Sequence, residues 1–395
     1  MSLDVPRWLR VLLVIAALAL ALVPAGLHWA LVDRQPAVTP AQVPGLLAAN
    51  ALLVDVRREA AARIAGSALV AEDALLALPS AGELPAELRG RTLILVCDGG
   101  VRSAVVTAHL RSLGLPALNL TGGMGAWSAH DGSLPQRVEP AWKQWLVVLT
   151  GFAVKPTYML LSLVLAIWLR RATTPGTVGL RRALWAFFAG EAFCALNYVA
   201  FAEESQFTDM LHAWGMAVAA SFAAWAVAAG ATRHLLPDAA GGRCALERLC
   251  QPCTRAGTCR HERLLPLGAV LILFSALVPL TAPCAGIAAS TTILGTPYLY
   301  RHDWVQVVFE LRCCPLAAVL LAALGLALAL VRRHGAAIAC LCAASGPLAF
   351  AFFRLVLVAV WRDDPAWFLA WEELGELATI LALIWWLIIF RRRDA

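Results

Sequence analysis

Apolar residues are gathered into long blocks along most of this chain, and polar residues separate the blocks. A helix needs roughly 17–25 mostly apolar residues to cross a hydrocarbon core about 30 Å thick. About eight blocks approach this length, and each predicts a transmembrane helix. The predicted spans are Val11–Leu31, Trp145–Leu169, Ala183–Ala202, Met210–Ala231, Leu264–Ala282, Cys314–Val331, Ala336–Trp361 and Leu374–Phe390.

Residues 35–140 break this pattern and have the composition of a soluble domain. The fold class that we predict is an α-helical membrane bundle of about eight transmembrane helices with an inserted α/β domain. Residues 1–34 are expected to form an N-terminal transmembrane anchor, and residues 35–140 the soluble domain. Residues 141–395 are expected to form a seven-helix transmembrane domain with a cysteine-rich loop at 236–263.

Composition supports a membrane protein, since 61% of the 395 residues are hydrophobic and 15% are charged. Soluble proteins hold roughly 45–50% apolar and about 25% charged residues. The net charge is +6, but the basic residues flank the apolar blocks and do not form one patch. This distribution argues against a nucleic-acid partner and predicts the lipid bilayer as the main surroundings of the chain.

The basic residues also predict an orientation, because short cytoplasmic loops are enriched in Lys and Arg. With a cytoplasmic N-terminus, most basic residues of the short segments fall inside, including Arg391–Arg393 at the C-terminus. Those outside are Arg34, Lys143, Arg301, Arg312 and Arg362. We therefore predict a multi-pass protein of the cell (inner) membrane with an extracytoplasmic soluble domain. A cleaved signal peptide in place of the first span leaves that domain on the same side.

Two short buried strands of a parallel sheet are predicted at Asn50–Val56 and Arg91–Cys97. The second strand runs into a glycine-bearing turn, Cys97–Ser103, and helical periodicity follows over Ala104–Leu113. A turn from a strand into a helix N-terminus gathers backbone N–H groups around one point, which favours anions and thiolates. Cys97 is therefore the candidate nucleophile.

These segments resemble the rhodanese family. The resemblance rests on Leu53–Arg57, on Cys97-x-x-Gly100-x-Arg102-Ser103, and on Leu120–Trp127 with its paired glycines. It implies that Cys97 accepts a sulfane sulfur as a persulfide and that Arg102 shapes the loop and meets an anionic donor. The same resemblance implies that loop amides hold the transferred sulfur. The substrate loop then consists of Asp98, Gly99, Gly100, Val101 and Ser103.

Two departures from the family pattern bear on the substrate. Ala62–Ser67 keeps only part of the usual motif. Asp98 adds a negative charge beside the nucleophile, which disfavours a dianionic donor such as thiosulfate. Thiosulfate and a persulfide or polysulfide therefore both remain candidate donors. A catalytically silent docking module is the alternative for the whole domain.

A second group of cysteines lies between the fourth and fifth predicted spans. Thiolates select zinc or an iron–sulfur cluster, and the predicted topology puts this loop in the reducing cytoplasm. The cluster could hold either cofactor, with His261 as an alternative ligand, or it could be a set of free thiols. Its members are Cys244, Cys250, Cys253 and Cys259.

Cys284, Cys313 and Cys314 lie near the outer ends of predicted spans. They could form a structural disulfide in an oxidising compartment, or a thiol relay that receives sulfur from Cys97. The other cysteines outside the two groups lie within spans and are expected to pack there, namely Cys194, Cys340 and Cys342.

Ionisable residues inside spans are costly and usually paired or functional. Lys155 and Glu191 have similar predicted depths, so we expect a buried ion pair between them. Arg354 lies deeper than Glu376, but its long side chain could reach that carboxylate. Other polar residues near the same face could line a polar vestibule or could be solvated loop charges. They are Glu203, Glu204, His212, His302, Asp303, Glu310, Glu372 and Glu373.

The sequence thus predicts a membrane-bound sulfurtransferase that passes sulfur or electrons to its helical domain. The alternative function is a transporter or membrane redox protein for sulfur compounds, in which the soluble domain only binds or senses its ligand. A third possibility is assembly of a partner complex without chemistry. The expected partners are a small sulfur-containing substrate and a thiol or redox protein.

Overall fold

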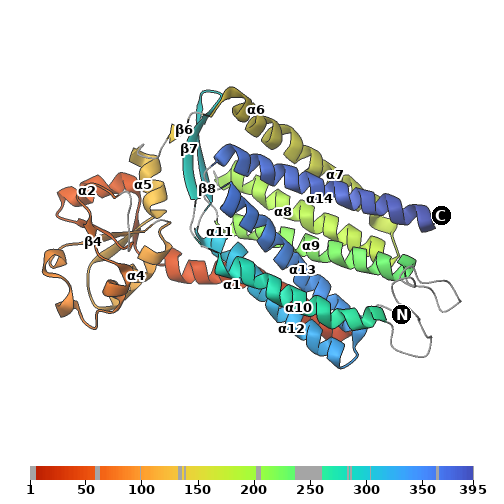
Figure 1. Cartoon of the computed structure of the whole chain (residues 1–395). Helices are drawn as coiled ribbons and strands as arrows, with labels where there is room; N and C mark the ends of the chain where they lie inside the picture. Colours follow the sequence, from red (N-terminus) through yellow and green to blue (C-terminus); the bar gives the residue numbers. More distant parts are fainter. Residues whose placement is uncertain are drawn as a thin grey trace. The chain divides into compact units, whose positions relative to one another are not determined.

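The structure is a computed structural model of the whole chain (Figure 1). It describes residues 6–57, 63–97, 99–131, 136–137, 139–201, 206–235, 260–282, 284, 287–302, 304–361 and 364–394. The chain forms two compact units, and each is described by itself. The sheet unit comprises Val23–Pro140 and Cys284–Val307, and the helical unit comprises Met1–Leu22, Ala141–Pro283 and Val308–Ala395.

The sheet unit is built on five parallel strands in the order β1-β5-β4-β2-β3. The strands are β1 (Ala37–Val38), β2 (Leu52–Asp55), β3 (Ala68–Leu69), β4 (Leu93–Val96) and β5 (Ala117–Leu120). All four residues of the central strand β4 are buried, which explains its continuous apolar sequence. The two predicted strands are confirmed, and they pair with each other as β2 and β4.

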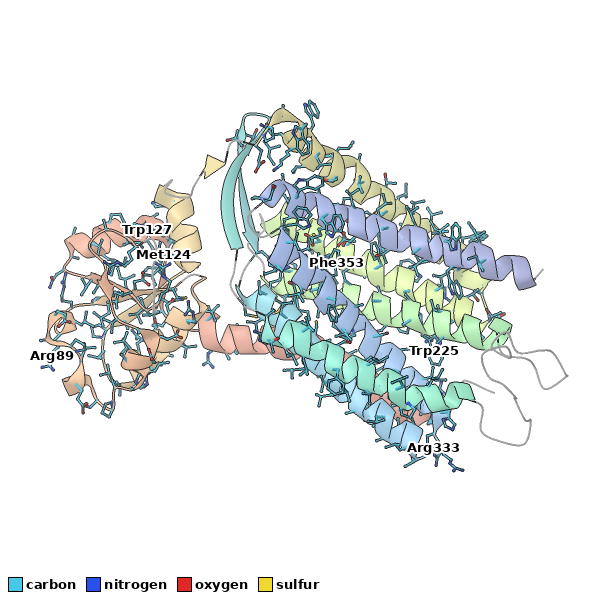
Figure 2. The ribbon with its side chains drawn as sticks, in the orientation of Figure 1. Arg89, Met124, Trp127, Trp225, Arg333 and Phe353 are labelled. Atoms are coloured by element: carbon cyan, nitrogen blue, oxygen red, sulfur yellow. The ribbon has the colours of Figure 1, made fainter. Side chains whose placement is uncertain are left out.

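Helices cover both faces of this sheet. They are α2 (Val43–Ala48), α3 (Glu72–Leu76), α4 (Val101–Ser112) and α5 (Gly123–Asp131). Successive strand residues point to opposite faces, so Leu53 packs with α2 and α5, and Val54 packs with α3 and α4. Met124 and Trp127 of α5 complete the first of these two cores (Figure 2).

A hairpin from the second half of the chain also belongs to the sheet unit. Its strands are β7 (Ile287–Ile293) and β8 (Thr296–His302), and β6 (Gln136–Arg137) pairs parallel to β7. The turn between β7 and β8 is Leu294-Gly295, with φ of 49° and 84°. Positive φ at both turn residues matches the twist of a tight hairpin. This hairpin lies between two predicted spans and outside residues 35–140, so the sequence pattern did not assign it to the soluble domain.

The helical unit contains six described helices that are long and apolar enough to cross a membrane. They are Ala141–Arg171, Pro175–Ala200, Phe207–Gly230, Leu264–Thr281, Gln306–Leu330 and His334–Val360. Each lies at a predicted span, and together they indicate a multi-pass membrane protein. Helices α1 (Arg7–His28) and α14 (Pro365–Asp394) form at the other two predicted spans but are not among these six.

The six candidate spans correspond to labelled helices in Figure 1. Ala141–Arg171 comprises α6 (Ala141–Leu149), η5 (Thr150–Val154), α7 (Lys155–Trp168) and η6 (Leu169–Arg171). The next are α8 (Pro175–Phe201), α9 (Gln206–Leu235) and α10 (Arg260–Thr281). The last two are α12 (Cys314–Leu330), preceded by α11 (Trp304–Val308) and η7 (Phe309–Cys313), and α13 (His334–Val360).

Two of these helices contain a π-helical turn at a proline. The turn η5 ends just before Lys155-Pro156, and η7 ends just before Cys314-Pro315. Proline has no N–H to continue the α-helical ladder, and the wider turn accommodates that break. The π-turns place Lys155 and Glu310 at irregular points of otherwise regular helices.

Candidate functional site

Cys97 follows directly after β4 and is 1% exposed. Its Sγ accepts hydrogen bonds from two backbone N–H groups, those of Gly100 (3.2 Å) and Ser103 (3.4 Å). Both donors lie at the N-terminus of α4, where the helix leaves N–H groups unpaired and concentrates positive potential. The predicted cradle of backbone donors around this thiol is therefore present.

The cradle depends on glycine at position 100. Gly100 has a φ of +83°, in the left-handed region that favours glycine. A Cβ atom there would lie 2.9 Å from Gly122 N and 3.1 Å from Leu120 O. The loop thus packs directly against the turn after β5, and Met124 N–H closes the contact by donating to Cys97 O at 2.8 Å.

The Ser103 side chain is a further contact of the sulfur. Its Oγ lies 3.3 Å from Cys97 Sγ and 2.7 Å from Asn119 Oδ1. The Asn119 Nδ2 group donates to Gly100 O at 2.9 Å, which orients the amide with its oxygen toward Ser103. One hydroxyl proton can serve only one acceptor, so Ser103 can donate either to Asn119 or to a sulfur that carries negative charge. Sequence reasoning placed Ser103 in the loop but did not identify Asn119.

Arg102 is the second residue of α4, and its Nη1 lies 3.6 Å from Glu72 Oε2. Both side chains are partly exposed, at 33% and 26%. Solvent weakens such a pair, which leaves the guanidinium able to exchange Glu72 for another anion. Asp98 lies outside the described residues, so the predicted effect of its charge stays a prediction.

The helical unit holds a second candidate site, a cluster of charged side chains buried among apolar helices. The predicted pair is confirmed: Lys155 Nζ lies 3.1 Å from Glu191 Oε2. Lys155 also pairs with Glu373 Oε1 at 3.0 Å. Glu191 is fully buried, so this ammonium is its essential counter-charge.

Tyr158 joins the same group and was not identified from the sequence. Its hydroxyl oxygen lies 2.9 Å from Glu191 Oε2, 2.6 Å from Glu373 Oε2 and 2.5 Å from Glu376 Oε2. Tyr158 lies one helical turn after Lys155, so both reach the same side of α7. The three-residue spacing from Lys155 could have pointed to Tyr158. Tyrosine is common in apolar spans, however, so its presence alone does not indicate a polar site.

Arg354 has partners other than the predicted Glu376. Its Nε lies 3.1 Å from Glu310 Oε1, and its Nη1 lies 2.5 Å from Glu372 Oε1. Glu376 faces Tyr158 instead, and its Oε1 lies 4.0 Å from His212 Nε2. Depth along two helices does not specify which faces meet, and this is why the expected pair was wrong.

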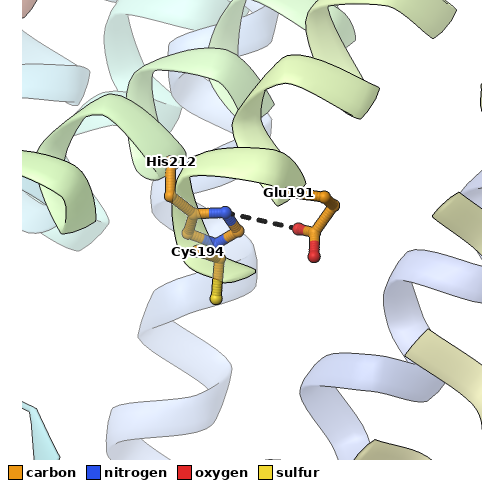
Figure 3. A group of neighbouring side chains, drawn as sticks. All are labelled: Glu191, Cys194 and His212. Atoms are coloured by element: carbon orange, nitrogen blue, oxygen red, sulfur yellow. Dashed lines mark ion pairs between the residues drawn. The ribbon is translucent and has the colours of Figure 1, made fainter. Parts of the chain in front are cut away.

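Several residues of the predicted vestibule are buried rather than solvated. They include His212, Glu310 and Glu373. His212 Nδ1 lies 3.3 Å from Glu191 Oε1, and Cys194 lies beside both residues (Figure 3). Cys194 Sγ thus lies within 4.8 Å of polar ligand atoms, whereas the sequence suggested a simple packing residue. His302 is buried in β8, and Glu203, Glu204 and Asp303 lie outside the described residues.

The remaining cysteines give a mixed result. Cys284, Cys313 and Cys314 are thiols in the structure, and Cys284 Sγ lies 3.9 Å from Val307 O. The structure therefore contains no disulfide among these described cysteines. Cys340 and Cys342 are buried, as expected for packing residues. The predicted metal ligands Cys244, Cys250, Cys253 and Cys259 lie outside the described residues, so that cofactor stays a prediction.

Comparison with protein families bears on the part of the chain that holds the Cys97 loop. Residues 39–130 match the rhodanese-like domain family, and this range includes β2–β5 and the Cys97 loop. Comparisons with curated proteins and with solved structures each found no significant match. The chain therefore contains a rhodanese-like domain, and the family match lies entirely within the sheet unit.

Proposed function

We propose that this chain is a membrane-bound sulfurtransferase that takes up sulfane sulfur as a persulfide on Cys97. The observation that carries the proposal is the convergence of two backbone N–H donors and one hydroxyl group on one sulfur. The N–H groups of Gly100 and Ser103 and the Ser103 hydroxyl all lie within 3.4 Å of Cys97 Sγ. Hydrogen bonds to a charged acceptor are stronger than those to a neutral one, so the loop can hold the negative charge that the sulfur carries during transfer.

The transfer takes place in two displacements. The Cys97 thiolate attacks the outer sulfur of the donor, the S–S bond of the donor breaks, and the leaving group departs with the bonding electron pair as sulfite or a thiolate. The new persulfide keeps its negative charge within reach of the loop donors. An acceptor thiolate then attacks the outer sulfur and forms a bond to it. Cys97 leaves with its electron pair and becomes the thiolate again.

The surroundings of Cys97 favour a donor that has an unhindered terminal sulfur atom and a low charge. The side chain is 1% exposed, so a terminal sulfur atom can reach it more easily than a bulky group. Asp98 also adds a negative charge next to the nucleophile in sequence. A persulfide or polysulfide therefore fits better than thiosulfate, which carries two charges.

The sulfur-accepting domain is proposed to lie on the extracytoplasmic side of an eight-span protein. The support is the distribution of Arg and Lys along the sequence, with α1 and α14 added to the six candidate spans. Reporter fusions after residue 140 and after residue 395 test this orientation. Activity of a periplasm-dependent reporter is expected after residue 140 only. Activity after residue 395 contradicts the proposed orientation.

The decisive test of sulfur transfer is a persulfide measurement on the full chain. The purified protein is treated with a polysulfide, trapped with an alkylating agent and digested for mass spectrometry. A mass gain of one sulfur is expected on Cys97 in the wild type and in Cys340→Ser, a control that changes another buried cysteine. Cys97→Ser should carry no gain at that position. Absence of the gain from wild-type Cys97 with both polysulfide and thiosulfate refutes the proposal.

A second function, transport by the helical unit, is favoured by one observation. Lys155 and Glu191 pair between two of the six candidate spans, and Glu373 of α14 joins them. Charges of this kind usually mark a pathway for ions, substrates or protons. Uptake of ³⁵S-labelled thiosulfate into proteoliposomes is expected to fall in Glu373→Gln if the unit transports sulfur. Equal uptake by the variant and the wild type argues against this second function.

A further inference from the structure

We propose that Glu191, Cys194 and His212 bind one zinc ion between α8 and α9. The ligand atoms of these three side chains all lie within 4.8 Å of one another (Figure 3). Imidazole nitrogen, thiolate sulfur and carboxylate oxygen are the ligands of zinc sites in proteins. This site is separate from the Cys97 loop and does not depend on sulfur transfer.

Helix geometry brings the three residues together. Glu191 and Cys194 are three residues apart on α8, so they lie on one face of that helix. His212 comes from α9, which crosses α8 at a pair of glycines. A Cβ on Gly215 would lie 2.6 Å from Gly190 Cα, so the two backbones are nearly in contact there. This close crossing places the His212 ring against the residue that follows Gly190.

The two oxygens of Glu191 have different surroundings. Oε2 faces Lys155 at 3.1 Å and the Tyr158 hydroxyl at 2.9 Å. Oε1 is buried and has no hydrogen-bond partner, and it lies 3.3 Å from His212 Nδ1. Ligands about 2.0–2.3 Å from one tetrahedral zinc ion lie roughly 3.3–3.8 Å apart. The Oε1–Nδ1 separation already has this spacing, and an ion there would occupy the open side of Glu191.

The charge of the neighbouring groups also calls for a cation. Tyr158 contacts Glu191, Glu373 and Glu376, and its one hydroxyl proton can serve only one of these carboxyl groups. Lys155 contributes a single positive charge to the same group. Buried carboxylates need paired charge, because desolvation is costly. A zinc ion supplies two positive charges next to Glu191.

His212 can orient itself for this role only if two contacts change: Nδ1 lies 3.2 Å from Gly190 O and must leave that acceptor, and Arg354 must move from Nε2. With Nδ1 on the ion, Nε2 carries the ring proton, and Glu376 Oε1 at 4.0 Å is the nearby carboxylate that can accept it. Such a second carboxylate commonly orients a metal-bound histidine. Arg354 Nη2 lies 3.5 Å from the same Nε2, so its guanidinium has to turn toward Glu310 and Glu372.

A second trio, His212, Glu372 and Glu376, also has ligand atoms within 4.8 Å of one another. Glu372 Oε1 lies 2.5 Å from Arg354 Nη1, so a guanidinium already neutralises that carboxylate. The Glu191 carboxylate also has a basic partner, Lys155, on its other oxygen, but only the first trio offers a thiolate, which zinc favours over a second carboxylate. We therefore assign the ion to the trio that contains Cys194.

The test is the zinc content of the full-length protein purified in detergent after growth with added Zn²⁺. Elemental analysis is expected to find about one equivalent of zinc fewer per chain in Cys194→Ser than in the wild type. The matched control is Cys340→Ser, which changes a buried cysteine that packs among apolar residues of α13 and should keep all its zinc. A difference between variants is required because the cysteines at 244–259 could also bind zinc.

Cobalt substitution identifies the ligand. Replacing zinc with Co²⁺ should give a thiolate-to-cobalt absorption band that is weaker in Cys194→Ser and unchanged in Cys340→Ser. Cys194→His should restore the zinc equivalent without restoring the band. If Cys194→Ser aggregates on size exclusion, Glu191→Gln provides the same comparison with less change in shape. Zinc contents that are equal in the wild type, Cys194→Ser and Glu191→Gln overturn the proposal, as does a wild type without zinc.

Discussion

The backbone N–H of Gly100 points at the Cys97 sulfur from 3.2 Å, and it does so from a left-handed conformation with φ of +83°. The two residues are three apart in sequence, and the turn between them is what directs the amide inward. The same turn sets the start of α4, so the donor geometry and the helix N-terminus are one structural feature. The sulfur site therefore depends on a conformation that only glycine adopts without strain.

Gly100→Ala is expected to abolish persulfide formation on Cys97 and to destabilise the protein more than Gly114→Ala. Both glycines have a left-handed φ, so both substitutions pay a conformational cost of about 1–3 kcal/mol. Only at Gly100 does an added Cβ also meet the backbone, 2.9 Å from Gly122 N, whereas nothing lies within 4 Å at Gly114. Thermal unfolding and the persulfide measurement on both variants test this. Equal behaviour of the two would show that the close packing is unimportant.

Ser103→Ala is expected to slow alkylation of Cys97 by iodoacetamide about tenfold, because a hydrogen bond to a charged group contributes roughly 1.5–3 kcal/mol. The variant removes the hydroxyl that lies 3.3 Å from Sγ but keeps the backbone N–H of the same residue. Ser112→Ala is the control, since that hydroxyl bonds to His109 O at the far end of α4. If Cys97 is alkylated at the same rate in Ser103→Ala and in Ser112→Ala, the Ser103 hydroxyl does not contribute to the reactivity of Cys97.

Lys155→Met is expected to destabilise the helical unit by about 3–5 kcal/mol, because it leaves buried carboxylates without their ammonium. The double variant Lys155→Met/Glu191→Gln should recover part of that loss, since it removes a charge from each side. Lys143→Met is the control: its partner Asp364 is 29% exposed, so the effect should stay within about 1 kcal/mol. Unfolding midpoints in detergent measure all three. A double variant that is less stable than Lys155→Met contradicts the pairing.

Gly215→Ala is expected to separate α8 from α9, to lower stability by about 1–3 kcal/mol and to reduce the zinc content. The added Cβ would lie 2.6 Å from Gly190 Cα, and two backbones cannot move aside as a side chain can. Gly268→Ala in α10 has open space around it, so it should be neutral or stabilise the helix by up to about 1 kcal/mol. Unfolding and elemental analysis are measured on the same samples. Unchanged zinc in Gly215→Ala would mean that the crossing does not organise the ligands.

Local patterns in the sequence were sufficient for much of the fold. The apolar runs at β2 and β4 could be identified without any partner, because a strand buried on both faces is mostly apolar, with Asp55 the polar exception at the end of β2. Hydropathy placed the six candidate spans for a similar reason, since crossing a membrane imposes length and composition on each helix separately. Cys97 could be identified because its role depends on a contiguous turn, in which residue spacing specifies geometry.

Contacts between distant segments had to come from the tertiary structure. Tyr158 meets three carboxyl groups from two other helices, and Arg354 pairs with Glu310 and Glu372 rather than with Glu376. The rotation of one helix against another selects these partners, and it follows from packing that involves many residues at once. The β7–β8 hairpin belongs to the sheet unit although it is distant in sequence, and β6 pairs with β7 there. Sequence periodicity specifies the faces of an element, and only packing decides which faces meet.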